Sequence, residues 1–153
     1  MKVCKNCKEE KEAEDFYLRN DNKDGLRNQC KACDIVRIKN HSKTKEGKLK
    51  AIYDSQTASS KHRRHESPTY TKKEFVDRFI NDLDYIRHYY SWCISNYSKK
   101  YSPSFDRKDD YKGYSFENIQ IMYWFENNEK GNLDIREGRN NKQAKGVIGT
   151  NIK

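Results

Sequence analysis

The sequence predicts an α+β protein, and three observations lead to this prediction. Near the N-terminus, two pairs of cysteines are each separated by two residues. Between residues 71 and 97, large apolar side chains recur at spacings that suit helices. From residue 102 onwards, the pattern predicts a strand, a loop, a second strand and a helix. Helices and short strands therefore occupy separate parts of the chain, which is typical of α+β proteins.

The composition limits the size of any hydrophobic core. Of the 153 residues, 33% are hydrophobic and 36% are charged, and eleven are tyrosines. A chain of this length forms one modest domain or two small ones. Because its large apolar side chains are few, we expect small cores that gain stability from a bound metal.

Charge is distributed unevenly along the chain, whose formal net charge is +9. Residues 102–137 carry five basic and eight acidic side chains, whereas residues 41–75 carry nine basic and four acidic ones. Excess positive charge favours polyanions, because phosphate contacts release condensed counterions. An acidic segment between basic flanks suits a divalent-cation site within a phosphate-binding surface.

Residues 1–40 are predicted to form a small module held together by zinc. Two C-x2-C pairs separated by 22 residues can direct four thiolates to one point and complete a tetrahedral site, which would be structural. The zinc ligands would be Cys4, Cys7, Cys30 and Cys33. Free thiols and a redox pair are the alternatives. A hairpin around Asp21–Gly25 would fill the gap, with Phe16, Tyr17 and Leu26 as its core.

Residues 41–70 are interpreted as a basic connector. They are rich in Lys, Ser, Thr and His and show almost no apolar periodicity. One hypothesis places the segment, helical in parts, along a phosphate backbone, with Lys61, Arg63 and Arg64 as contacts. The alternative hypothesis is a solvated linker.

Residues 71–137 are predicted to hold two supporting helices and the strand–loop–strand–helix segment. Thr71 and Glu74 have capping-box spacing, and the apolar pattern of the first helix runs from Phe75 to Leu83. A second helix contains the aromatic run between Tyr85 and Tyr97, with His88 as a packed or surface residue and Cys93 in the core. Residues 138–153, with four basic and no acidic side chains, are predicted to be a basic tail.

The later motifs resemble those of phage HNH-type endonucleases, including relatives of homing endonucleases. The most specific similarity lies in Ser104–Tyr114, Asn118–Ile121 and Trp124–Gly131. The paired cysteines, Tyr70–Phe75 and Asn140–Lys145 also resemble that family, so the similarity covers most of the chain. It implies a ββα-metal nuclease motif within residues 71–137.

The resemblance also implies roles for individual residues. In this family a base lies at the end of the first strand, and an Asn supports it. A His or Asn on the helix binds one divalent cation. By motif, Asp106 would be a metal ligand, Asn118 the supporting residue and Asn127 the helix ligand for Mg²⁺ or Mn²⁺. Lys130, one helical turn beyond Asn127, would contact a DNA phosphate.

The sequence departs from the family pattern at Arg107, which stands where the catalytic His is usual. An arginine stays protonated and is no general base, although it can bind phosphate or stabilise developing charge. The base would then be Asp106, Asp109, Asp110 or a metal-bound hydroxide. A turn-rich acidic hairpin without chemistry is the alternative for this segment.

The functional hypothesis is therefore a metal-dependent endonuclease that acts on double-stranded DNA and carries a structural zinc. A non-catalytic zinc-module protein that binds nucleic acid is the main alternative, and a zinc-stapled protein-interaction module is a weaker one. Because no signal peptide, membrane-spanning run, P-loop, HExxH or G-x-S-x-G motif is present, we expect no membrane partner and no small-molecule substrate. The expected location is the cytoplasm of a phage's bacterial host. The oligomeric state stays open.

Overall fold

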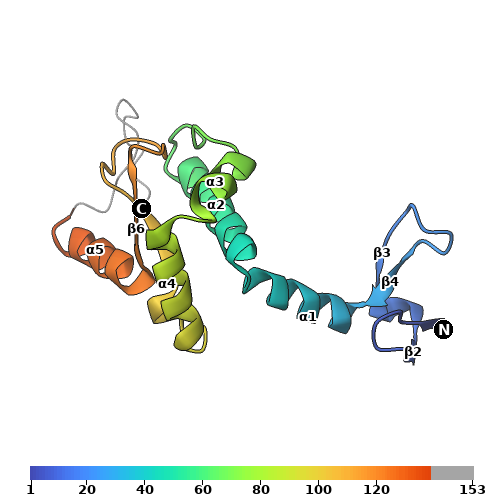
Figure 1. The fold of residues 1–153 in the computed structure, drawn as a ribbon. Coiled ribbons are helices and arrows are strands. Elements are labelled where there is room, and N and C mark those ends of the chain that lie inside the picture. Colours follow the sequence, from blue (N-terminus) through green and yellow to red (C-terminus); the bar gives the residue numbers. More distant parts are fainter. Residues whose placement is uncertain (139–153) are drawn as a thin grey trace. The chain divides into compact units, whose positions relative to one another are not determined.

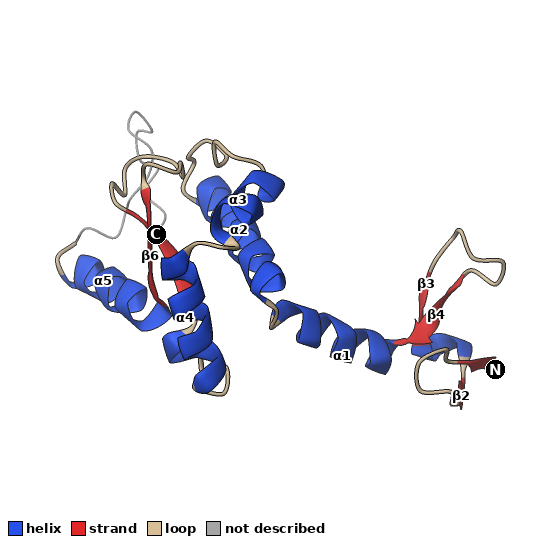
Figure 2. Cartoon of the chain, in the orientation of Figure 1, coloured by secondary structure: helices blue, strands red, loops and turns tan. Residues whose placement is uncertain are grey.

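The computed structural model describes residues 1–138, so the predicted basic tail lies, apart from Gly138, outside the described residues. The described part contains five α-helices and three two-stranded antiparallel sheets, which confirms the predicted α+β class (Figures 1 and 2). The chain divides into two compact units, residues 1–44 and the chain from Lys45 onwards. Among residues 1–138, no helix has both the length and the apolar character needed to span a membrane.

The N-terminal unit consists of two short hairpins and one helix. Its elements are β1 (Lys2–Val3), β2 (Glu10–Lys11), the 3-10 helix η1 (Ala13–Asp15), β3 (Phe16–Leu18), β4 (Leu26–Cys30) and α1 (Lys31–Ser42). β1 pairs with β2, and β3 pairs with β4. The predicted hairpin around residues 21–25 is present, and its Gly25 has a φ of +69°, a conformation that favours glycine.

One predicted core residue of this unit is not in the core. Phe16 is buried and Leu26 packs against the same cluster, as predicted, but Tyr17 is 42% exposed. Successive side chains of a strand point to opposite faces, so Phe16 and Tyr17 cannot share one side of the hairpin. The Tyr17 ring lies instead beneath two cations, 5.8 Å from the Arg27 guanidinium and 5.5 Å from Lys31 Nζ.

The second unit contains four helices and one hairpin. Its elements are α2 (Lys45–His62), α3 (Lys72–Phe79), α4 (Leu83–Ile94), the 3-10 helix η2 (Lys99–Tyr101), β5 (Pro103–Arg107), β6 (Ile119–Tyr123) and α5 (Trp124–Arg136). β5 and β6 pair antiparallel, with Asp106 opposite Gln120. The predicted order of strand, loop, strand and helix is therefore present.

The segment interpreted as a connector differs from that interpretation, because most of it is the helix α2. Leu49 and Ile52 are buried on α2 in the main core, and Gln56 and Ser60 continue the same buried face. These four positions are three or four residues apart, as a helix face requires. Because two of them are polar, the buried face left no apolar periodicity in the sequence.

The two helices predicted after residue 70 are α3 and α4. The capping box at the start of α3 is confirmed, since the Thr71 side chain accepts a bond from Glu74 N and the Glu74 carboxylate accepts one from Thr71 N. Leu83, assigned to the first helix, instead begins α4 and is 82% exposed. Asp82 causes this break, because its carboxylate caps the new helix at Tyr85 N. Cys93, predicted to be core, is only half-buried.

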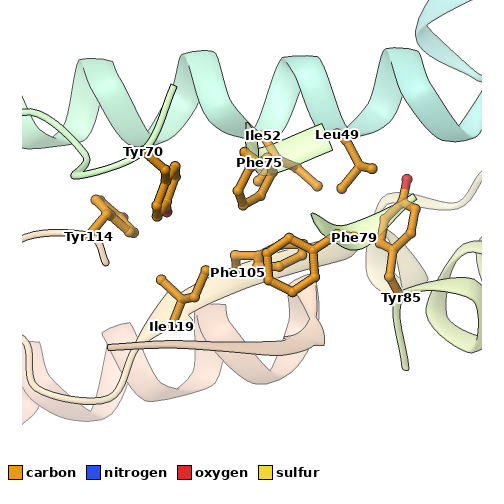
Figure 3. Close-up of a cluster of buried hydrophobic side chains, with 9 residues drawn as sticks. All are labelled: Leu49, Ile52, Tyr70, Phe75, Phe79, Tyr85, Phe105, Tyr114 and Ile119. Carbon is orange, nitrogen blue, oxygen red and sulfur yellow. The ribbon is translucent and has the colours of Figure 1, made fainter. Parts of the chain in front are cut away.

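The main core joins α2, α3 and α4 to the hairpin of β5 and β6 (Figure 3). Phe105 on β5 packs edge-on against Phe75 and Phe79 of α3, with ring centroids 5.0 and 4.8 Å apart. Edge-to-face aromatic pairs at such distances are favourable beyond the area they bury. The buried members are Leu49, Ile52, Tyr70, Phe75, Phe79, Tyr85, Phe105, Tyr114 and Ile119. This core fixes the position of β5, on whose other face the candidate site lies.

Candidate functional site

The four cysteines of the N-terminal unit converge on one point. Cys4 and Cys7 flank a turn after β1, Cys30 ends β4, and Cys33 lies in the first turn of α1. Their sulfur atoms all lie within 4.8 Å of one another. Tetrahedral Zn–S bonds of about 2.3 Å place thiolates about 3.8 Å apart, a spacing that lies within this limit.

The backbone around the cluster favours thiolates. The N–H of Cys30 points at Cys4 Sγ, 3.3 Å away, and is the largest of the contacts that lower the pKa of the Cys4 thiol to about 6. Backbone bonds also act to lower the pKa values of Cys7 and Cys30, but burial and neighbouring thiols outweigh them and raise both. The carbonyl of Cys4 accepts the N–H of Lys8, whose φ of +63° closes the turn between the first two cysteines. Cys4 and Cys30 are almost fully buried against Phe16. The cluster is thus placed to hold a metal ion, and it also forms the core of its unit.

A cleft of roughly 370 Å³ lies in the second unit between α2, β5 and α5. On β5, Phe105 and Arg107 are buried, whereas Ser104 and Asp106 are half-buried and line the cleft. This division follows from the alternation of side chains along a strand. The titratable and amide side chains that line the cleft include Lys48, Arg63, Asp106, Asp110, Asn127, Lys130 and Asp134.

Lys130 of α5 binds two carboxylates inside this cleft. Its Nζ is 2.5 Å from Asp106 Oδ2 and 3.3 Å from Asp110 Oδ2, and it also donates to the Arg107 carbonyl at 3.1 Å. The Asp106 and Asp110 side chains are only 12% and 17% exposed. Burial opposes the charge on Lys130, but the two carboxylates outweigh it and raise the pKa of Lys130. Negative charge in the cleft is therefore partly neutralised by the protein itself.

Asn127 lies one helical turn before Lys130 and faces the same strand. Its Nδ2 donates to Ser104 Oγ at 2.8 Å, which leaves the amide oxygen for another partner. Ser104 and Asp106 are two residues apart on one face of β5, and Asn127 and Lys130 are three apart on one face of α5. The structure thus brings Asp106 and Asn127, the two predicted metal ligands, to the same cleft.

Arg107 points away from Asp106 and is 2% exposed. Its Nη1 donates to the Lys112 carbonyl at 3.1 Å, and its guanidinium lies 5.3 Å from the centroid of the Tyr114 ring. Burial lowers the pKa of Arg107, although a guanidinium keeps its proton at neutral pH. Arg107 does not line the cleft, and its contacts hold the loop after β5 in place.

Asn118 also holds that loop. Its side-chain oxygen accepts the N–H of Asp109 at 2.8 Å, and its Nδ2 donates to the carbonyls of Asp109 and Gly113 at 3.0 and 2.9 Å. Asp109 in turn accepts the N–H of Tyr111 at 3.0 Å, so its carboxylate is engaged within the loop. Asn118 therefore supports the backbone from which Asp110 reaches the cleft.

The predicted DNA-binding residues divide into two groups. Arg63 and Lys130 line the cleft, whereas Lys61 and Arg64 are exposed at the end of α2 outside the cleft lining. Sequence reasoning counted Lys48 only among the basic residues of the connector and not as a site residue. Its Nζ lies 2.5 Å from Ser102 Oγ and 4.9 Å from the centroid of the Trp92 ring. Lys48 on α2 and Arg63, one residue beyond its end, are fifteen residues apart, and this spacing is informative only once α2 is recognised as a helix.

Within residues 1–138, the cysteine cluster is the one place where three or more His, Cys, Asp or Glu side chains converge closely enough to hold a metal. No histidine of this part of the chain lines the cleft. Comparisons with protein-family models, with curated proteins and with solved structures found no match to the chain. Any function must therefore be argued from the cleft and the cysteine cluster themselves.

Proposed function

We propose that the protein is a metal-dependent DNA endonuclease whose chemistry takes place in the cleft between α2, β5 and α5. The observation that carries the proposal is the meeting of Asp106 and Asn127 in one cleft with the cations Lys48, Arg63 and Lys130. Carboxylate and amide oxygens are ligands that Mg²⁺ and Mn²⁺ prefer. Lysine and arginine side chains bind phosphates.

The residues of the cleft fall into distinct proposed roles. Asp106 and Asn127 would hold the divalent cation, which supplies Lewis-acid stabilisation of a scissile phosphate. Asp110 is the best-placed base among the carboxylates considered, because it lines the cleft while Asp109 is bound into the loop. Lys130 would exchange its carboxylate partners for a phosphate when DNA enters. Arg107 and Asn118 would act by fixing the loop that carries Asp110.

The cysteine cluster would contribute stability rather than chemistry. Four thiolates fill a tetrahedral zinc site and leave no open position for water. The N-terminal unit has a small buried core, formed by Phe16 with Cys4 and Cys30. We therefore propose that zinc is required for this unit to fold, as it is in other small metal-stapled modules.

A plasmid-nicking assay tests the proposal. The purified chain would be incubated with supercoiled plasmid in Mg²⁺, Mn²⁺ or EDTA. We expect nicking only with the divalent cations and its loss in Asp106→Ala and Asn127→Ala, with salt-sensitive DNA binding retained. Asp77→Ala is the matched control, because Asp77 is an exposed carboxylate on α3 that is paired with Lys73 outside the cleft. Full cutting by Asp106→Ala would refute the assignment of the site.

A second candidate function is nucleic-acid binding without cleavage. The observation that favours it is the ion pairing of Lys130 with Asp106 and Asp110, since an ammonium group competes with a divalent cation for the same oxygens. Arg107 agrees with it, because an arginine stays protonated and supplies no base. Tight, salt-sensitive DNA binding with no nicking under any metal condition would select this function.

A further inference from the structure

A second hollow, outside the cleft, lies where α4 ends and α5 begins. It measures roughly 410 Å³ and is lined mainly by apolar surface. Three aromatic rings form most of its wall, those of Tyr101, Tyr123 and Phe125, and together they are called here the aromatic patch. Ile94, at the end of α4, is 87% exposed at the same place. Apolar surface that remains open to solvent at one site is typical of a binding surface.

The rings of the aromatic patch form a corner. Tyr123 and Phe125 are nearly parallel, with an angle of 15° between them and centroids 5.8 Å apart. Tyr101 stands almost perpendicular to both, at 6.0 Å from Tyr123 and 6.2 Å from Phe125. A flat guest in this corner meets the face of one ring and the edge of another, the two arrangements that aromatic groups prefer.

One ring of the patch, that of Tyr123, is held in place by neighbouring side chains. Tyr123 donates its hydroxyl proton to Ser91 Oγ at 3.0 Å, and its ring packs on His88 with centroids 4.3 Å apart. Glu126 also lines the hollow, and its carboxylate accepts a hydrogen bond from the N–H of Tyr123 at 2.8 Å. Because the Tyr123 side chain is already fixed, a guest would lose little binding energy to ordering it.

Two lysines flank the aromatic patch. Lys100 Nζ lies 5.4 Å from the centroid of Tyr101 and 5.5 Å from that of Phe125, and Lys99 Nζ lies 4.3 Å from the centroid of Trp124. Neither lysine forms an ion pair with a carboxylate in residues 1–138. Both charges thus remain available to an anion beside the exposed rings.

We propose that the aromatic patch binds unpaired nucleotides, with a base stacked on Phe125 and Tyr101 and a phosphate bound by Lys100. Aromatic faces beside cations match the two parts of a nucleotide, its flat base and its anionic backbone. Every base offers a π face, so the contact would be tolerant of sequence. In a duplex the base faces are hidden in the stack, so the patch would select single-stranded DNA or RNA.

The location of the patch fits an elongated ligand. Trp124 lines the cleft, while its neighbours Tyr123 and Phe125 line the hollow of the patch. A single strand could therefore follow the start of α5 from one site to the other. The inference does not depend on cleavage, since it concerns a different surface from the carboxylates of the cleft.

Fluorescence anisotropy with labelled oligo(dT), oligo(U) and a DNA duplex tests the proposal in the full chain. We expect Phe125→Ala and Tyr101→Ala each to weaken single-strand binding about five- to hundredfold, the range for loss of one stacked base. Duplex affinity should change less than about twofold. Lys100→Gln should reduce the salt dependence of single-strand binding by about 0.7 in the log–log slope, the value for one phosphate contact. Equal losses on oligo(dT) and oligo(U) would assign the site to the base face and phosphate, and a loss on one alone would add recognition of the sugar or of the thymine methyl group.

Two substitutions separate stacking from general apolar contact. Phe125→Tyr keeps a flat ring and should retain affinity, whereas Phe125→Leu keeps apolar bulk and should lose it. The matched control is Tyr90→Ala, since Tyr90 is 53% exposed on α4 but does not line the hollow. Wild-type affinity in Phe125→Leu, or equal losses on duplex and single strand, would overturn the proposal.

Photocrosslinking gives a readout that does not depend on the variants. An oligonucleotide carrying 5-iodouracil crosslinks to aromatic side chains on which the base stacks. We expect the crosslinked peptide to contain Tyr101 or Phe125. Crosslinks found only elsewhere in the chain would overturn the proposal even if affinity falls in the variants.

Discussion

Lys130 Nζ lies 2.5 Å from Asp106 Oδ2 and places an ammonium group among the side chains proposed to hold a divalent cation. The pair is partly shielded, with 33% of the lysine side chain and 12% of the aspartate side chain exposed. Asp110 shares the same ammonium group at 3.3 Å. Cation binding and lysine binding are therefore alternatives at these oxygens.

Replacing Lys130 by Met should increase the affinity of the cleft for Mn²⁺. The substitution leaves two shielded carboxylates without their cation, which costs about 1–2 kcal/mol of folding stability in the absence of metal. Mn²⁺ should restore that stability, and isothermal titration should show binding about tenfold tighter than in the wild type. The double variant Lys130→Met, Asp106→Asn is the control and should show no gain. Unchanged Mn²⁺ affinity in the single variant would contradict the competition.

The cysteine cluster should hold one metal ion per chain and stabilise the N-terminal unit. Native mass spectrometry should find one zinc, and Cys30→Ser should lose it, because three thiolates leave the site incomplete. Loss of the ion should unfold residues 1–44, since binding energies of about 10 kcal/mol couple to folding in such modules. Cys93→Ser is the matched control, because Cys93 lies outside the cluster. Loss of zinc in Cys93→Ser with full zinc content in Cys30→Ser would refute the assignment.

Removing the Asn118 side chain should open the loop after β5. Asn118→Ala removes three hydrogen bonds to the backbone of Asp109 and Gly113, which should cost about 2–3 kcal/mol in urea unfolding. Asn118→Asp is the sharper test. It preserves the acceptor for Asp109 N but sets an oxygen against two carbonyls, so it should be at least as destabilising. Wild-type stability in Asn118→Asp would contradict this role.

DNA binding should weaken as the pH rises through about 8. Burial lowers the pKa of Lys48 to about 8, so its positive charge is present below this value and lost above it. If Lys48 contacts a phosphate, duplex affinity should fall on the order of fivefold between about pH 7 and 9. Lys48→Arg stays charged throughout and should remove this dependence. An identical pH profile in that variant would exclude Lys48 from the contact.

Local features of the sequence predicted the elements that depend on neighbouring residues. The capping box at Thr71, the turn at Gly25 and the strand β6 each involve residues close in the chain, and each is present in the structure. The cluster of four cysteines could also be predicted from the sequence, because two short spacings suffice to define a tetrahedral set of thiolates. Leu83 was misassigned because a cap at Asp82 outweighs apolar periodicity.

Tertiary packing decided what spacing alone could not. The helix α2 was not evident, because Gln56 and Ser60 occupy buried positions that sequence patterns assign to apolar residues. Lys48 became a cleft residue only through contacts with Ser102 and Trp92, which lie far along the chain. Such burial depends on partners from distant segments, and no local pattern records them.

The sequence by itself determined the α+β class, the cysteine ligand set, and the strand–loop–strand–helix order that brings Asp106 and Asn127 together. These follow from short-range spacing and from the alternation of side chains on strands and helices. Only the tertiary structure decided that Arg107 faces the core, that Lys130 neutralises Asp106, and that Tyr101 joins Tyr123 and Phe125. Each of these features depends on contacts with residues far away in the sequence. Those contacts determine which side chains are buried and which charges are paired.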